Sequence, residues 1–248
     1  SAKAGVSKST ISRFVTRLGY TNFRGFLSAL KQDAVNGLDT PMTRFAGSEK
    51  PSSPDAVLQR HLSEASTNIR QTLEKIPLAN FEKALDLIFD DSRHLFMAGG
   101  YVTEYYLRAF AAHLRYIRKH FTVLGANAFD IASELGQMDA AAVVLAVSIR
   151  RYSSVNGKLL RYFHERGHEV ILITDTYSSP FFHYATVPLV VHLEGTGTFF
   201  SSCSVLAMLE ALLAGVILRC GDSFLDRLAP IIAVQNLMDL YAVKGVKG

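Results

Sequence analysis

Two adjacent arginines between hydroxyl side chains form the segment of this chain best suited to bind an anion. The run Ser148-Ile149-Arg150-Arg151-Tyr152-Ser153-Ser154 follows an apolar stretch and precedes an amphipathic one. Guanidinium groups bind carboxylate and phosphate through paired hydrogen bonds, and a helix that starts after such a loop adds its backbone N–H groups. The same arginines are equally suited to salt bridges with a second subunit. Anion binding and subunit contact therefore both remain open.

Two other loops carry residues that could lie beside these arginines. Ala98-Gly99-Gly100-Tyr101-Val102-Thr103 combines two glycines with a predicted helix start, which favours an anion close to the backbone, although a simple tight turn explains it as well. Thr174-Asp175-Thr176-Tyr177-Ser178-Ser179-Pro180 supplies a polar wall, in which Asp175 is expected to cap or shape a turn rather than contact a ligand. The candidate ligand-binding residues are Gly99, Gly100, Tyr101, Thr103, Ser148, Arg150, Arg151, Ser153, Asp175 and Ser179.

Each of these loops follows a short apolar run that predicts a buried β-strand. Apolar runs that alternate with amphipathic segments are typical of an α/β fold with a mostly parallel sheet, here of five strands, covered on both faces. Because ligands bind beyond the carboxyl ends of such strands, we expect the loops to meet there. The predicted strands are 94–97, 121–124, 142–147, 170–174 and 189–192, and the predicted helices are 53–75, 78–89, 102–118, 129–135, 153–166, 199–218 and 223–241.

The first 44 residues concentrate positive charge. Seven of them are Lys or Arg and two are Asp, a net charge of +5, whereas the whole chain sums to +4. Ser7 is suited to cap a short helix in which Ile11, Phe14, Val15 and Leu18 form an apolar stripe. Polar and basic residues at the start of that helix suit contacts with phosphates and base edges. A small amphipathic helical pair with a solvated basic face is the alternative.

This basic segment also matches a specific motif. Ala4-Gly5-Val6-Ser7-x-x-Thr10-x-x-Arg13-Phe14, followed by Leu18-Gly19-Tyr20 and Phe23-x-x-Phe26-x-x-x-Leu30, resembles the helix-turn-helix domain of RpiR-type bacterial transcription regulators. The resemblance implies that 7–18 is a DNA-recognition helix, with contacts from Lys8, Ser9, Thr10, Ser12 and Arg13. Because such a unit needs a helix before the turn, we expect it to be truncated at its N-terminus.

The order of the three loops resembles a sugar isomerase (SIS) domain, the effector domain of RpiR-type regulators, over roughly residues 80–220. The run 170–175 followed by Ser179-Pro180 is the closest match. Members that bind phosphosugars carry Ser-x-Ser-Gly-x-Thr after the third strand, whereas this chain has Arg150 and Arg151 in place of the second Ser and the Gly. The pair either binds another anion, such as a carboxylate metabolite, or fills the pocket and leaves a structural dimerisation domain.

Composition and turn residues predict how the chain is divided. At 248 residues and 49% hydrophobic, it can bury a substantial core in one or two domains. Two cysteines indicate neither a disulfide framework nor a zinc site and suit a reducing cytoplasm. The apolar run 199–218 includes Glu210 and several serines, so it predicts a buried helix rather than a membrane span. We expect a helix-turn-helix domain over 1–35, a linker over 36–54 with room for a short helix, and a SIS-like domain over 55–248.

The sequence does not favour catalysis. Isomerisation needs a base beside the substrate, and Glu104 is better explained as an acid in the first turn of a helix. His164 and His168 have a spacing found in metal sites, but they lie near a helix end beside Gly167, where a solvated face is expected. Cys203 has no basic neighbour in the sequence and is expected to be a small buried residue. We therefore expect no catalytic residues, no metal and no cofactor.

Residues and resemblance together predict a cytoplasmic bacterial transcription regulator that binds double-stranded DNA and has no membrane partner. Its α/β domain is expected to form a homodimer or higher homo-oligomer and to sense a small anionic metabolite, either a sugar phosphate or a sugar acid. A dimer is implied because two-fold proteins read paired half-sites on DNA. Two alternatives remain: a purely structural, oligomerising SIS domain, or a sugar-phosphate isomerase with a vestigial basic end.

Overall fold

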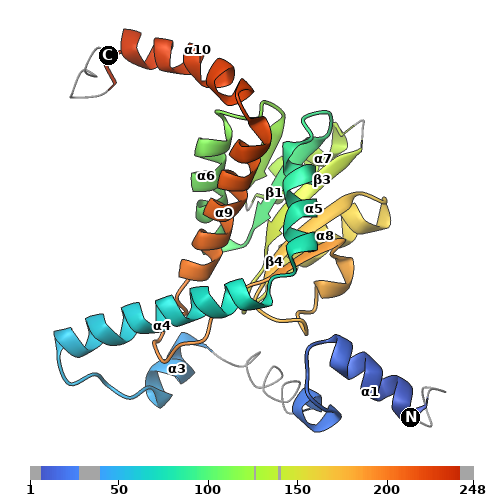
Figure 1. Ribbon diagram of the computed structural model, residues 1–248, viewed down its shortest axis with the longest axis vertical. Coiled ribbons are helices and arrows are strands. Elements are labelled where there is room, and N and C mark those ends of the chain that lie inside the picture. The colour runs from blue at the N-terminus through green and yellow to red at the C-terminus, as the bar shows by residue number, and fades with distance from the viewer. Residues whose placement is uncertain (1–6, 28–39, 126, 139–140, 241–248) are drawn as a thin grey trace.

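The computed structural model describes residues 7–27, 40–125, 127–138 and 141–240, most of which surround one five-stranded sheet (Figure 1). The strands are β1 (His94–Gly99), β2 (Phe121–Leu124), β3 (Ala142–Val147), β4 (Glu169–Thr174) and β5 (Val187–Val190). The helices before the sheet are α1 (Lys8–Arg17), α3 (Pro41–Gly47), α4 (Pro54–Lys75) and α5 (Leu78–Phe89). The later helices are α6 (Tyr101–Leu114), α7 (Ala128–Gly136), α8 (Ser154–Glu165), α9 (Cys203–Cys220) and α10 (Ser223–Leu237).

All neighbouring strands of the sheet are parallel, in the order β2-β1-β3-β4-β5. Leu95 of β1 pairs with Phe121 of β2 on one side and with Val143 of β3 on the other. Every residue of β3 is buried, which explains why this strand is apolar at each position instead of alternating. The predicted α/β fold with a five-stranded parallel sheet is confirmed.

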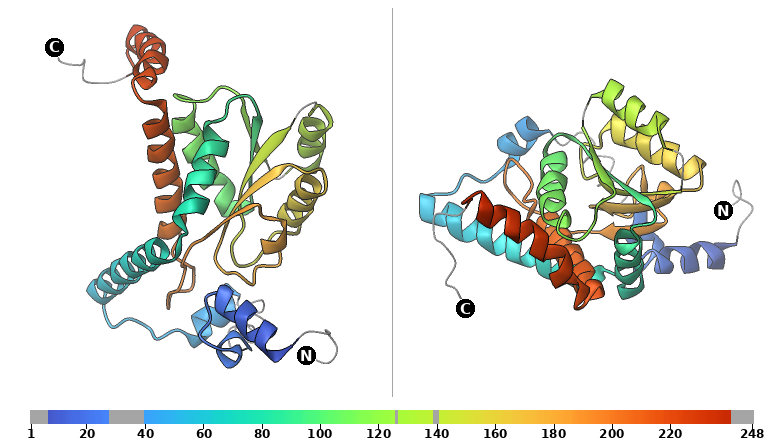
Figure 2. Two further views of the ribbon diagram at one scale, coloured as in Figure 1. Left: turned by 45° about the vertical axis from the view of Figure 1, so that its right-hand side comes forward. Right: turned by 90° about the horizontal axis from the view of Figure 1, so that it is seen from above.

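The sheet separates two apolar layers, because alternate side chains of a strand point to opposite faces. Leu95 and Met97 of β1 belong to the cluster formed with α5, α6 and α9. Phe96 and Ala98 belong to the cluster formed with α7 and α8 on the other face. Figure 2 shows the two groups of helices on opposite sides of the sheet.

Strand β5 forms one edge of the sheet and contains a proline. Pro188 pairs with Leu172 of β4, and its carbonyl accepts a hydrogen bond of 2.9 Å from the side-chain amide of Asn80 in α5. An edge strand tolerates proline, which lacks a backbone N–H. The strand therefore includes Pro188 and runs over Val187–Val190, two residues earlier than the predicted 189–192.

Helix α9 begins later than predicted. The apolar run 199–218 was expected to be helical throughout, but the helix spans Cys203–Cys220 and leaves residues 191–202 irregular. Among the described residues, α9 is the one helix long and apolar enough to span a bilayer by length and composition. Its Val205, Leu212 and Val216 are buried, and the helix packs against α4, α5 and α6. It serves as a core helix, as the sequence predicted.

Helix α6 is shorter than the predicted 102–118 and ends at Leu114, after which the chain turns Arg118 into the interior. The Arg118 side chain is almost completely buried and donates hydrogen bonds to main-chain oxygens from separate turns of the chain. Its guanidinium donates to the carbonyls of Ile88 (2.6 Å), Asp90 (2.8 Å), His120 (3.1 Å) and Arg93. One side chain thus ties the end of α5 to the starts of β1 and β2.

The N-terminal helix α1 begins at the predicted cap, where the Ser7 hydroxyl accepts a hydrogen bond of 3.1 Å from the backbone N–H of Thr10. Its apolar stripe is only partly buried: Val15 is buried, but Phe14 is 55% exposed. Residues 1–6 and 28–39 lie outside the described residues, and they include part of the predicted motif and the predicted domain boundary at residue 35.

The predicted linker does contain a short helix, α3. Thr40 caps it and forms a reciprocal capping box with Thr43, and Pro41 occupies the first turn, where it costs no backbone hydrogen bond. None of the α3 residues is buried. Its attachment to the rest of the protein therefore rests on a few surface contacts.

Candidate anion-binding site

A cavity of about 660 Å³ opens at the carboxyl ends of β1 and β3. It brings together the first two predicted loops, and seven of the ten predicted effector-binding residues line it. These residues are Gly100, Tyr101, Thr103, Ser148, Arg150, Arg151 and Ser153.

The position of the cavity follows from the order of the strands. The chain leaves β1 through α6 on one face of the sheet and leaves β3 through α8 on the other face. A crevice forms where neighbouring strands diverge in this way, and open α/β sheets bind ligands there. The N-termini of α6 and α8 both border this crevice, so their backbone dipoles favour a negative charge in the cavity.

The turn from β1 into α6 is closely packed. A Cβ atom at Gly99 would lie 2.5 Å from the backbone nitrogen of Glu104, so only glycine fits. The Thr103 hydroxyl accepts a hydrogen bond of 2.9 Å from the Gly100 N–H, and its single proton is shared between the carbonyls of Gly100 at 2.8 Å and Val147 at 3.2 Å. Thr103 therefore fastens the glycine loop to the end of β3.

Ser148 follows β3 directly and has an unusual environment. Its backbone N–H donates to the Ile173 carbonyl at 2.9 Å, but its buried hydroxyl has no hydrogen-bond partner in the described structure. An unpaired buried hydroxyl costs free energy unless a ligand satisfies it. Ser153 caps α8 on the same side of the cavity, where its hydroxyl accepts from the Asn156 N–H at 3.5 Å.

The two adjacent arginines have different roles. Arg150, whose side chain is 11% exposed, donates to the Asp175 carboxylate at 2.7 Å and to the Glu194 carboxylate at 2.9 Å. The side chain of Asp175 is fully buried and also accepts from the Tyr152 hydroxyl at 2.9 Å. Asp175 was predicted to cap or shape a turn, but its carboxylate instead pairs with a cation from the loop that follows the neighbouring strand β3.

The protonation states in this network are fixed by burial and by the pairing. Burial raises the pKa of Tyr152 far above its ordinary value, and the Asp175 charge raises it further, so the phenol remains a donor. Burial alone would lower the pKa of Arg150, but hydrogen bonds to Glu194 and Asp175 outweigh it and raise the pKa. Arg150 is therefore a permanent cation whose charge is balanced by two carboxylates.

Arg151 is the cation of the cavity that remains available to a ligand. Its side chain is exposed at the rim and forms no ion pair or hydrogen bond with the described residues. Its backbone has a φ of +64°, a left-handed conformation that is uncommon for residues other than glycine. Such conformations persist where the surrounding structure imposes them, and they cluster at binding sites.

Three predicted residues do not line the cavity. Gly99 packs against the first turn of α6, Asp175 holds Arg150, and Ser179 is buried within the third loop. Conversely, eight lining residues were not among the predicted site residues, namely Val102, Tyr106, Val147, Ile149, Asn156, Phe199, Phe200 and Ser202. The two phenylalanines were missed because they open an apolar run that is typical of a continuous helix.

The predicted DNA contacts lie on or beside the first two turns of α1. Ser9, Thr10, Ser12 and Arg13 are exposed there. Lys8 is the first residue of the same helix. The Thr10 hydroxyl lies 2.8 Å from that of Ser7, so it is partly engaged in the helix cap. These residues share one short helix, as the prediction requires.

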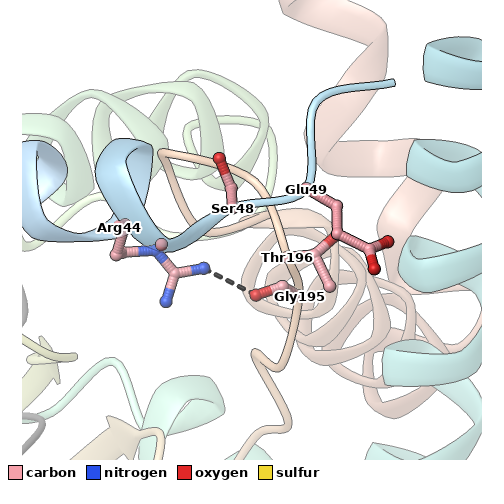
Figure 3. Close-up of a pocket in the computed structure, with 6 residues that line it drawn as sticks. Arg44, Ser48, Glu49, Gly195 and Thr196 are labelled. Carbon is pink, nitrogen blue, oxygen red and sulfur yellow. Dashed lines mark hydrogen bonds between the residues drawn. The ribbon is translucent and has the colours of Figure 1, made fainter. Parts of the chain in front are cut away.

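A second, shallower hollow of about 340 Å³ lies between α3 and the irregular segment before α9 (Figure 3). The Arg44 guanidinium crosses it and donates to the Gly195 carbonyl at 2.6 Å. Ser48, Glu49 and Thr196 surround this contact. The hollow marks where the linker helix rests on the SIS-like body.

Comparisons with known proteins identify the family. Residues 87–215 match the SIS domain family. An uncharacterized HTH-type transcriptional regulator of Clostridium perfringens is 24% identical over 181 residues, which are 72% of this chain and 63% of that protein. The chain thus spans less than two thirds of the length of this curated relative.

Solved structures share the fold at low sequence identity. The sugar isomerase domain of an RpiR transcription factor from Sphaerobacter thermophilus has a TM-score of 0.62 and 22% identity, covering 71% of this chain and 97% of that one. NanR of Vibrio vulnificus, in complex with ManNAc-6P, has a TM-score of 0.63 and 17% identity, covering 97% and 85%. A phosphoheptose isomerase from Francisella tularensis has a TM-score of 0.56 and 9% identity, covering 66% and 98%.

The matched SIS region is more than half of the chain, and the helical segment that resembles a DNA-binding unit precedes it. A transcriptional regulator is among the proteins that it resembles in sequence, and the sugar isomerase domain of a transcription factor is among the structures that share its fold. The chain therefore belongs to the SIS-domain family.

Proposed function

We propose that this protein is a cytoplasmic DNA-binding transcriptional regulator whose SIS domain, over 55–248, binds a small anionic metabolite as its effector. The observation that carries the proposal is the Ser148 hydroxyl, which is buried, lines the cavity and has no partner in the described structure. A ligand oxygen would satisfy it, and the nearby N-termini of α6 and α8 favour a ligand with negative charge.

The anion would lie against Ser148, Ser153 and the first turn of α8, with Arg151 closing over it from the rim. Arg150 would act as a support, because its hydrogen bonds are already committed to carboxylates. A sugar phosphate or a sugar acid fits this arrangement, since both combine an anionic group with hydroxyls for the Thr103 side of the cavity. The sugar phosphate bound by NanR, whose structure shares this fold, supports that class.

Substitution of Ser148 by alanine tests the effector site. We expect Ser148→Ala to weaken binding about tenfold, because a charge-assisted hydrogen bond is removed, while the free energy of unfolding stays equal or rises by about 0.5–1 kcal/mol. Arg151→Ala should also weaken binding about tenfold. Thermal shift with hexose 6-phosphates, sugar acids and inorganic phosphate would find the ligand, and calorimetry would measure the affinities.

Thr174→Val is the matched control for Ser148→Ala. Its hydroxyl is also buried without a partner in the described structure, but Thr174 does not line the cavity. This variant should bind the effector like the unaltered protein. The effector site is wrong if no compound in the panel stabilises the protein, or if Ser148→Ala binds as tightly as the parent. Either result would favour a SIS domain with a purely structural, oligomerising role.

We propose binding rather than catalysis at this site, although phosphosugar isomerases share the fold. An isomerase would need an acid or base beside its substrate, and the carboxylate nearest the glycine loop in sequence, that of Glu104, pairs with Arg108 at 2.8 Å. Glu104 is not among the residues that line the cavity. The carboxylate is thus engaged by a neighbouring turn of the same helix.

DNA binding is assigned to α1, within the proposed helix-turn-helix domain over 1–35. We expect Lys8→Ala/Arg13→Ala to weaken binding to all DNA sequences alike, because these side chains are proposed to contact phosphates. The slope of log affinity against log salt should fall by about one unit for each phosphate contact that the substitutions remove. Fluorescence anisotropy with labelled duplexes at several salt concentrations measures both quantities.

Arg161→Ala is the control for charge alone, since Arg161 is an exposed arginine of α8 and pairs only with Glu165 at 3.7 Å among the described residues. It should leave the salt dependence intact. Affinity in the double variant equal to that of Arg161→Ala would remove α1 from the DNA interface.

A homodimer completes the proposal, because paired half-sites on DNA need two helix-turn-helix domains. Helix α10 supports it: none of its residues is buried, and Leu225, Val234 and Leu237 are more than half exposed. An apolar helix with this exposure is suited to cover a second copy of the chain. The linker over 36–54 would then set the spacing of the two helix-turn-helix domains.

A further inference from the structure

Phe200 lies between two guanidinium groups that belong to different parts of the protein. The Arg44 guanidinium of α3 lies 3.9 Å from the centre of the Phe200 ring, and the Arg150 guanidinium of the cavity lies 4.9 Å from it. We propose that Phe200 is a relay through which the state of the cavity controls the docking of the linker helix α3. This regulation rests on the proposed function of the cavity as the effector site.

On the linker side, Arg44 makes long-range contacts for a helix that buries none of its own residues. Its guanidinium donates to the Gly195 carbonyl at 2.6 Å (Figure 3). It also donates to the Gly197 carbonyl at 2.9 Å and covers the Phe200 ring. The linker is tied again after α3, where Arg60 of α4 donates to the Glu49 carbonyl at 3.3 Å. The position of α3 therefore depends on the shape of the 194–200 segment.

On the cavity side, the same segment is held by Arg150. Its guanidinium binds the Glu194 carboxylate at 2.9 Å at one end of the segment and lies over Phe200 at the other. Both Arg150 and Phe200 line the cavity. Asn68 and Glu64 of α4 also hold this segment, at the Glu194 carbonyl and at Thr196. An anion or a sugar ring that enters the cavity thus meets the two cavity-lining side chains that contact the segment on which α3 rests.

The direction of the coupling follows from charge. An anion held at Ser148 and Ser153 lies in the same cavity as Arg150, and its negative charge weakens the attraction between that guanidinium and Glu194, whose side chain is 61% exposed. Release of Glu194 removes one contact that holds the 194–200 segment. The same segment carries the Gly195 and Gly197 carbonyls that bind Arg44. Helix α3 lies between the proposed DNA-binding unit and the SIS domain in the sequence. A change in its docking therefore changes the position of the helix-turn-helix domain relative to the SIS domain. A ligand has this effect only if it binds the two arrangements with different affinity.

A mutant cycle measured by hydrogen exchange tests the relay on the chain without any ligand. Arg150→Lys keeps a positive charge beside Asp175, so the fold is retained, but it removes the planar group that covers Phe200. We expect it to speed amide exchange in residues 41–47 about threefold, the effect of removing one cation–π interaction. Phe200→Leu should speed the same amides at least as much. The double variant should be slower than the product of the two single effects, because both variants remove the same Arg150–Phe200 contact.

Two further variants sharpen the cycle. Arg60→Ala removes the hydrogen bond to the Glu49 carbonyl, which does not involve Phe200. Its effect on the exchange rate should therefore multiply with that of Arg150→Lys. Arg44→Ala alters only an exposed helix, so the body remains folded, and by linkage it should speed exchange in residues 148–153.

Exchange in 41–47 that Arg150→Lys leaves unchanged would overturn the relay, as would independent effects of Arg150→Lys and Phe200→Leu. The outcome does not depend on finding the effector. If no anion binds but the cycle shows coupling, the proposed function fails and the relay stands as a structural link. If an anion binds and the cycle shows no coupling, the relay alone fails.

Discussion

Replacement of Arg118 by methionine is expected to lower the free energy of unfolding by about 3–5 kcal/mol, because the buried guanidinium satisfies four main-chain carbonyls. Methionine fills a similar volume but donates no hydrogen bond, so carbonyls of three separate turns are left without their partner. The destabilisation should appear in urea unfolding followed by far-UV circular dichroism, a suitable probe since the chain has no Trp.

Arg115→Met is the matched control, because Arg115 is an exposed arginine three residues before Arg118. Its guanidinium lies 6.0 Å from the centre of the Phe121 ring. This variant should change stability by less than about 1 kcal/mol. Equal unfolding midpoints for the two variants would show that the carbonyls around Arg118 find water or other donors. The predicted role of Arg118 in joining α5, β1 and β2 would then be wrong.

The second large effect is expected at Asp175. Asp175→Ala should lower the free energy of unfolding by about 3 kcal/mol, because it leaves the Arg150 guanidinium in a largely buried position with only the exposed Glu194 as a counter-charge. It also removes the acceptor of the Tyr152 hydroxyl. The measurement is again equilibrium unfolding in urea.

Glu194→Ala provides the comparison, since it removes the exposed partner of the same arginine and should cost less than about 1 kcal/mol. Adding Arg150→Met to Asp175→Ala should recover part of the stability, because the unpaired charge is removed as well. If Asp175→Ala and Glu194→Ala destabilise equally, solvent screens the Arg150–Asp175 pair more than its burial indicates.

The architecture could be predicted from the sequence because the signals for it are local. Runs such as 142–147 are apolar at every position, and only a strand covered on both faces requires that pattern. The loops after β1 and β3 were then placed at one cavity by the general behaviour of parallel sheets, without knowledge of any contact.

The partners inside the site could not be predicted, because each comes from a distant part of the chain. Nothing near Arg118 in the sequence indicates that carbonyls of residues 88, 90 and 93 would surround it. Arg150 and Asp175 are 25 residues apart, and two neighbouring strands bring them together. Phe200 lies at the start of a run that predicts a helix, and its position between two arginines depends on a linker that precedes it by more than 150 residues.

The edge of the sheet at β5 has a consequence for how copies of the chain can meet. An open strand edge is a template on which another chain can add a strand, the step that leads to aggregation. Pro188 has no backbone N–H to donate, and its carbonyl already accepts a hydrogen bond from the side-chain amide of Asn80. A strand from a second chain would therefore lack hydrogen bonds at this position, which disfavours extension of the sheet across this edge.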